Sequence, residues 1–125
     1  MARARLTLAG HPFAPIGMGE VLRTSFRALR EVGAKVAVRD VYRGSPASAI
    51  ETADAIRPCL VERLDSDVTI FVLNGDERDQ AFRHLGEEEI GGAGHKIVYP
   101  AWELPRYPEA WAAELAHYDE VWGFS

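Results

Sequence analysis

A strand–helix–strand pattern in the first third of the chain most constrains the fold. Between Gly19 and Val32, apolar residues recur at the spacing of an amphipathic helix, and Gly33 follows as a C-cap. Residues 5–9 before this helix alternate in polarity, and residues 35–42 after it are rich in β-branched side chains. Because one helix between two neighbouring strands forms a right-handed parallel unit, this pattern predicts a parallel sheet.

The rest of the chain continues this alternation of strands and helices. Residues 67–73 form a nearly continuous apolar run, which is typical of a strand covered on both faces. We expect further strands at 96–99 and 120–124, helices at 58–64, 76–85 and 108–117, and loops at 43–52 and 86–94. The pattern predicts an α/β fold with a Rossmann-like, doubly wound, mostly parallel sheet and helices on both faces.

Length and composition limit the organisation of the chain and the classes of protein it can belong to. The 125 residues, 47% of them hydrophobic, fit a single domain over residues 1–125. A net charge of −5 argues against a nucleic-acid partner. The short apolar stretch after the basic start is too brief for a signal peptide or a membrane span, which indicates a cytoplasmic protein.

The cysteine and histidine positions exclude two further kinds of site. Cys59 is the only cysteine, so an intrachain disulfide is impossible. The four histidines are scattered along the sequence, and we expect no metal site.

Ligands of doubly wound sheets bind beyond the carboxyl ends of the strands, where we expect three loops to meet. The first loop places Gly17, Met18 and Gly19 at the start of the strongest helix, where exposed amides can hold an anion. Glycine before a helix is also ordinary turn chemistry, so both interpretations stay open. Leu22 occupies the third glycine position of the dinucleotide fingerprint, which disfavours NAD binding, and no Walker motif is present.

The other two loops carry polar and aromatic side chains. Asn74 and Asp76 follow the apolar strand and can bind hydroxyl groups, although Asp76 is equally suited to cap the next helix. The loop at residues 99–108 holds Trp102, Glu103 and Arg106 among three prolines. Aromatic faces beside charged groups are common at sugar sites, while the structural alternative is a rigid turn with Trp102 in the core.

The remaining tryptophans, Trp111 and Trp122, fall within a predicted helix and a predicted strand. We therefore expect both to serve packing.

Several of these segments together resemble a known family. They are Gly-Met-Gly-Glu at 17–20, Val-Arg-Asp-Val-Tyr at 38–42, Asn-Gly-Asp at 74–76, Tyr-Pro-Ala-Trp-Glu-Leu-Pro-Arg-Tyr-Pro at 99–108, and Tyr-Asp-Glu-Val-Trp at 118–122. Over nearly its whole length the chain resembles the N-terminal domain of bacterial group 1 glycosyltransferases, the retaining family-4 enzymes of GT-B fold. It departs from many relatives at Leu73 and Pro100, where they carry histidine and an aromatic residue.

The resemblance implies a function and a set of site residues. It implies that the full-length enzyme transfers a sugar, with retention and without a metal or cofactor, from a nucleotide-sugar donor to a carbohydrate or lipid-linked acceptor. It implies donor-phosphate binding at Gly17, Met18 and Gly19. It implies a catalytic or acceptor-orienting role for Glu103, while the acceptor-binding residues would be Asn74, Asp76, Trp102 and Arg106.

The resemblance also bears on partners, because the donor-binding motifs of the family lie in a C-terminal domain that this sequence does not include. The domain on its own would then be inactive. The face that meets the second domain is also suited to homodimer formation, and the full-length protein to peripheral membrane association.

Two alternatives remain open. The first is a non-catalytic Rossmann-like binding or regulatory module that has kept the fold. The second is a flavodoxin- or response-regulator-like domain, although the chain lacks an acidic cluster after its first strand.

Overall fold

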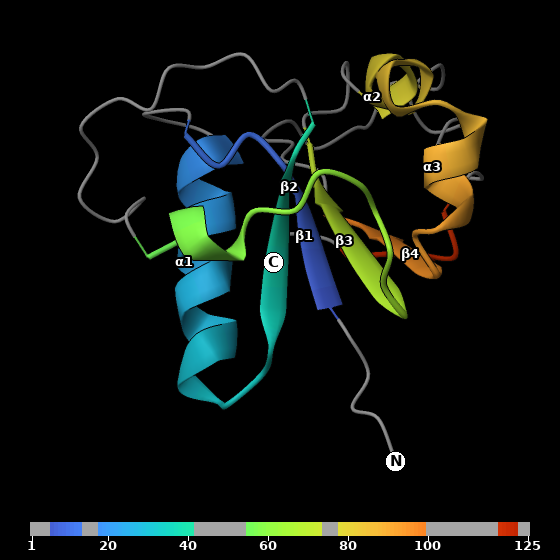
Figure 1. Cartoon of the computed structure of the whole chain (residues 1–125). Coiled ribbons are helices and arrows are strands. Elements are labelled where there is room, and N and C mark those ends of the chain that lie inside the picture. Colours follow the sequence, from blue (N-terminus) through green and yellow to red (C-terminus); the bar gives the residue numbers. More distant parts are fainter. Residues whose placement is uncertain (1–5, 14–17, 42–54, 74–77, 100–117, 123–125) are drawn as a thin grey trace, which may run out of the picture.

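The structure is a computed structural model that describes residues 6–13, 18–41, 55–73, 78–99 and 118–122 (Figure 1). Its elements, in chain order, are β1 (Leu6–Gly10), α1 (Met18–Glu31), β2 (Val36–Asp40), the 3-10 helix η2 (Arg57–Cys59), β3 (Val68–Val72), α2 (Arg78–Leu85), α3 (Glu87–Gly91), β4 (His95–Val98) and β5 (Glu120–Val121). All five predicted strands are confirmed, with bounds that differ by a few residues. The expected segments at 43–52 and 108–117 lie outside the described residues.

The described strands form one sheet in the order β2-β1-β3-β4-β5, and every pairing is parallel. The central strand β1 has Leu6 opposite Val36 on one side and Val68 on the other. Each strand therefore ends at the same edge of the sheet, which we call the carboxyl edge. The prediction of an α/β fold with a parallel sheet is confirmed.

Two apolar clusters cover the two faces of this sheet. Successive strand residues point to opposite faces, and accordingly Leu8 and Ile70 belong to one cluster while Ala9 and Phe71 belong to the other. Leu22 and Phe26 of α1 pack in the first cluster. Residues of α2 and α3, including Ala81, pack in the second, so the described helices lie on different faces (Figure 1).

Helix α1 ends as its sequence predicts. Gly33 has a φ of 86°, a left-handed conformation that favours glycine. Its N–H donates to the carbonyl of Arg30, and the N–H of Ala34 donates to that of Leu29, the two bonds of a Schellman motif. Val32, expected on the apolar face, is exposed because the helix has already ended.

Helix α3 replaces part of the loop predicted at residues 86–94, and that prediction was wrong. Glu89 of α3 forms a buried ion pair with Arg39 of β2, with 2.7 Å between Glu89 Oε2 and Arg39 Nε. The same carboxylate accepts a hydrogen bond from the N–H of Leu64. A long-range charge pair therefore holds the short helix, which the local polar, glycine-rich sequence did not indicate.

The prediction of a helix at residues 58–64 is also wrong in its length. The helix is reduced to η2, because Leu60 leaves the helical conformation and forms a parallel bridge with Val38. The N–H of Val61 donates to the Val38 carbonyl at 2.9 Å. The edge of β2 thus competes successfully with a local helix for these backbone groups.

A candidate site at the carboxyl edge of the sheet

The strand order places a switch point between β1 and β3. From β1 the chain leads through α1 to β2 on one side, whereas β3 lies on the other side and leads away to β4. Gly10 pairs with Val72, so the ends of β1 and β3 are direct neighbours. In open α/β sheets ligands bind at such a point, outside the carboxyl ends of the strands.

Gly10, the last residue of β1, allows the strand to approach its neighbours closely. A Cβ at this position would lie 2.6 Å from the Val72 carbonyl oxygen and 3.1 Å from Leu22 of α1. Only glycine fits without displacing the backbone of β3 or the start of α1. The loop that follows is thereby set directly against the helix.

Arg23 fixes this loop from the α1 side. Its side chain is buried, and Nη1 donates to the Pro12 carbonyl at 3.1 Å. Arginine usually lies on the polar face of an amphipathic helix, whereas Arg23 in α1 is buried. The reason is that the chain folds back over α1 at Pro12 and gives the guanidinium a carbonyl partner within the protein.

Arg57 adds a second cation beside the same loop. Its guanidinium lies over the ring of the buried Phe13, with the Arg57 Cζ 5.2 Å from the ring centroid. Arginine stacks well on aromatic faces and keeps donors at its edge. The loop after β1 therefore contacts two guanidinium groups, one from α1 and one from η2.

Asp40 provides a carboxylate at the same edge. It is the last residue of β2, is half-buried and pairs with Gly10. In dinucleotide-binding domains, an acid about 20 residues after the glycine loop accepts hydrogen bonds from ribose hydroxyls. Sequence reasoning did not select Asp40 as a site residue, although its place at the end of a predicted strand was a usable signal.

Of the site residues predicted from the sequence, the structure describes only Met18 and Gly19. Met18 is the first residue of α1, and Gly19 is the second and is buried. Gly17 lies outside the described residues, as do Asn74, Asp76, Trp102, Glu103 and Arg106. The loop at 99–108 nevertheless begins at this edge, because Tyr99 directly follows β4.

A polar network joins β4 to β5 at the outer side of the sheet. His95 Nε2 lies 3.2 Å from Glu120 Oε2, whose other oxygen accepts a hydrogen bond from the indole N–H of Trp122 at 3.2 Å. Asp119 accepts a hydrogen bond from the backbone N–H of Lys96. That bond lowers the pKa of Asp119, and the bonds from Trp122 and then His95 lower the pKa of Glu120.

Trp122 corrects a further prediction from the sequence. It was expected to serve packing, but 41% of it is exposed. Its ring contacts Tyr99 edge-on with 6.4 Å between the centroids. The pairing of β5 with β4 explains this exposure, because β5 is the outermost strand of the described sheet and has a neighbour on one side only.

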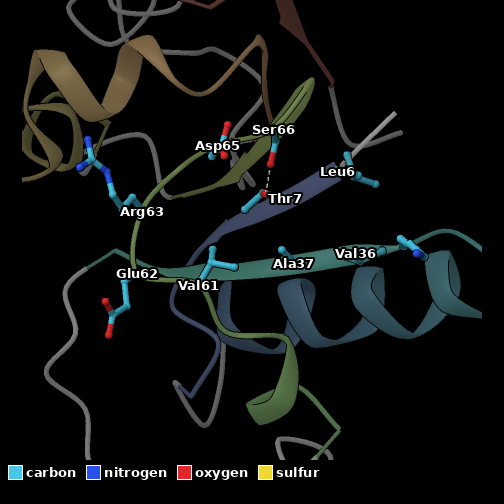
Figure 2. Close-up of a pocket in the computed structure, with 10 residues that line it drawn as sticks. Leu6, Thr7, Val36, Ala37, Val61, Glu62, Arg63, Asp65 and Ser66 are labelled. Carbon is cyan, nitrogen blue, oxygen red and sulfur yellow. Dashed lines mark hydrogen bonds between the residues drawn. The ribbon is translucent and has the colours of Figure 1, made fainter. Parts of the chain in front are cut away.

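A separate cavity of about 490 Å³ opens near the opposite edge of the sheet (Figure 2). Its walls come from the starts of β1 and β2 and from residues 61–66, and they include a hydrogen bond between the hydroxyls of Thr7 and Ser66. Lys35, Arg63 and Asp65 also line it. We assign the candidate site to the carboxyl edge because parallel sheets bind ligands there.

Two other kinds of feature are absent from the part of the chain that the structure describes. No group of three or more His, Cys, Asp and Glu side chains there is arranged to hold a metal ion. None of the helices there has the length and apolar character needed to cross a membrane.

The structure defines a parallel α/β domain with a switch point between β1 and β3, which is where ligands bind in open α/β sheets. The chain matches no protein-family model, no curated protein and no solved structure. The strand order alone therefore gives the fold class of this chain.

Proposed function

We propose that this chain is the acceptor-side domain of a cytoplasmic, retaining glycosyltransferase of GT-B type, with a Rossmann-like, doubly wound sheet. The observation that carries the proposal is the place where β4 ends. Tyr99, the first residue of the most specific part of the resemblance, directly follows β4 at the carboxyl edge. The packing of α1 on one face and of α2 and α3 on the other supports the doubly wound arrangement.

In this proposal the domain binds a carbohydrate or lipid-linked acceptor. Trp102, Asn74, Asp76 and Arg106 contact the acceptor, and Glu103 orients it or takes part in catalysis. The donor is a nucleotide diphosphate sugar, held mainly by a second domain, with its phosphates approaching the start of α1 at Gly17, Met18 and Gly19. The position of Met18 and Gly19 in the first turn of α1 supports donor-phosphate binding, because the backbone N–H groups of a helix N-terminus suit an anion.

Saturation-transfer NMR with a panel of carbohydrate and lipid-linked acceptors tests the proposal on this chain. We expect transfer to the acceptor ring protons, and loss of it in Trp102→Ala and Glu103→Gln. Glu88→Gln on α3 serves as the control, because Glu88 is exposed and belongs to a helix on the second-cluster face. Absence of transfer across the whole panel would contradict the proposal.

One observation favours a second candidate. The strand order β2-β1-β3-β4-β5 is the order of flavodoxin-like domains, which bind their ligand at the same switch point. Against it, β1 ends at Gly10 and is followed by His11 rather than by an acidic cluster. A flavin absorbance spectrum after incubation with FMN separates the two candidates, since an acceptor-binding domain leaves the free flavin spectrum unchanged.

A further inference from the structure

An exposed tryptophan lies at the outer end of the carboxyl edge. Trp122 follows β5 directly, and its backbone N–H donates to the Val98 carbonyl at the end of β4. It is therefore a neighbour of Tyr99, where the segment at 99–108 begins. With 41% of its surface open, Trp122 presents a large aromatic side chain beside the proposed acceptor loop.

Hydrogen bonds hold this ring in one orientation. The indole N–H donates to Glu120 Oε1, and Glu120 Oε2 lies within hydrogen-bond distance of His95 Nε2. The Tyr99 ring meets the indole at an interplanar angle of 68°. An aromatic side chain that is already oriented loses little conformational entropy when a ligand stacks on it.

The surroundings of Trp122 indicate the chemistry of the ligand. Interface cores between proteins are depleted of charge, whereas half-exposed Asp119 and Glu120 lie close to this ring along the chain. A pyranose ring combines an apolar C–H face, which stacks on indole, with hydroxyls that donate to carboxylates. The Glu120 carboxylate has about four acceptor sites and uses two, so it can accept further hydrogen bonds.

We propose that Trp122 is a stacking platform for a sugar ring of the acceptor, and that Glu120 accepts hydrogen bonds from the hydroxyls of this sugar. The inference rests on the proposed function and extends it by naming a subsite on β5, beside Tyr99 at the end of β4. Trp122 and Glu120 then determine acceptor specificity, because they contact a sugar unit and not the group that reacts. Tyr99 and His95 are positioning residues, since they act through the ring and the carboxylate.

Indole N–H signals in ¹⁵N-correlation NMR spectra of the chain test this inference, with methyl pyranosides and octyl glucoside as probes. The Trp122 signal is assigned from its loss in Trp122→Ala. We expect saturable shifts at this signal and about a tenfold weaker Kd in Trp122→Ala, with most of the affinity kept in Trp122→Phe. Glu120→Gln is expected to weaken binding, and it should also move the Trp122 signal of the unbound protein, because Glu120 Oε1 accepts the indole hydrogen bond.

Val121→Ala is the matched control, because Val121 is equally exposed but points to the opposite face of β5. If a probe binds without shifting the Trp122 signal, and Trp122→Ala binds it with the wild-type Kd, this inference is overturned and the proposed function stays intact. If no probe and no acceptor binds, both this inference and the proposed function are contradicted. A Trp122 signal that responds to protein concentration and not to sugar would show a second copy of the chain on this surface, and would also overturn the inference.

Discussion

Replacement of Glu89 by alanine is expected to destabilise the protein strongly. The Arg39 and Glu89 side chains are only 4% and 11% exposed, and 2.7 Å separates Arg39 Nε from Glu89 Oε2. Alanine would leave the Arg39 guanidinium buried without its partner and would remove the acceptor for the Leu64 N–H. Breaking a buried pair from one side costs about 3–5 kcal/mol. The free energy of unfolding should fall by about that amount.

The corresponding change in thermal stability is large. For 125 residues, an unfolding entropy of about 2.1 cal/mol/K per residue gives about 0.26 kcal/mol/K. A loss of about 3–5 kcal/mol therefore lowers Tm by about 11–19 °C. Urea unfolding followed by circular dichroism measures the free energy, and a thermal scan measures Tm.

The adjacent residue provides a matched control. Glu88 lies on the same helix and also pairs with an arginine, Arg63, but those side chains are 91% and 64% exposed, with 3.5 Å between Glu88 Oε1 and Arg63 Nη2. Glu88→Ala should change stability by less than about 1 kcal/mol, because exposed pairs contribute little. Similar losses for Glu88→Ala and Glu89→Ala would refute the argument that burial makes the Arg39–Glu89 pair important.

Three further outcomes are expected. Gly33→Ala should lower the free energy of unfolding, measured with urea, by about 1–2 kcal/mol, because Gly33 has a φ of 86°. Gly91→Ala at the end of α3 is the control: an added methyl meets open space there, so stability should stay the same or rise slightly. Equal effects of the two substitutions would contradict the Schellman assignment. Gly10→Ala should cost about 1–3 kcal/mol or more by the same measurement, since the added methyl would clash with a β3 carbonyl, and wild-type stability would disprove the close packing. The lowered pKa of Asp119 means that its carboxylate stabilises the fold above its usual pKa of 3.8 and that this stabilisation is lost as pH falls through the lower folded value. The protection factor of the Lys96 amide, which compares its exchange rate with the intrinsic rate at the same pH, should therefore fall in the wild type as pH is lowered through that value. Asp119→Asn should remove this fall, and the same fall in both proteins would count against the bond.

The sequence predicted the strands and α1 well because their signals are local. The apolar periodicity of α1 and the glycine at position 33 are both short-range features, and both correspond to the structure. The run at 67–73 is apolar because β3 is covered on both faces, and Ile70 and Phe71 indeed lie in opposite clusters. Wherever the local pattern and the tertiary environment agreed, the prediction was confirmed.

The predictions failed where a distant partner decided the outcome. Helix α3 depends on Arg39, 50 residues earlier in the chain, and no spacing rule connects the two positions. Residues 60 and 61 pair with the edge of β2 instead of continuing a helix. Trp122 is exposed because β5 is the outermost described strand, a property of sheet order that its own sequence cannot express. Of the predicted site, the described residues place only Met18 and Gly19.

The central position of β1 also has a consequence for synthesis of the chain. Its residues are translated before those of β2 and β3, and Leu6 meets Val68 only after about 60 more residues have been added. The β2-facing side of β1 can pair once Val36 has been added, whereas Val68 comes 32 residues later. At about 5–20 residues per second, the β3-facing backbone of β1 therefore waits for roughly 2–6 s after its β2-facing side could pair. During that interval the nascent β1–α1–β2 unit carries an open strand edge next to apolar side chains such as Leu8, a form that chaperones recognise. Slowing translation between β2 and β3 would lengthen this interval, so codon usage in that part of the gene should affect the yield of folded protein more than codon usage after β3.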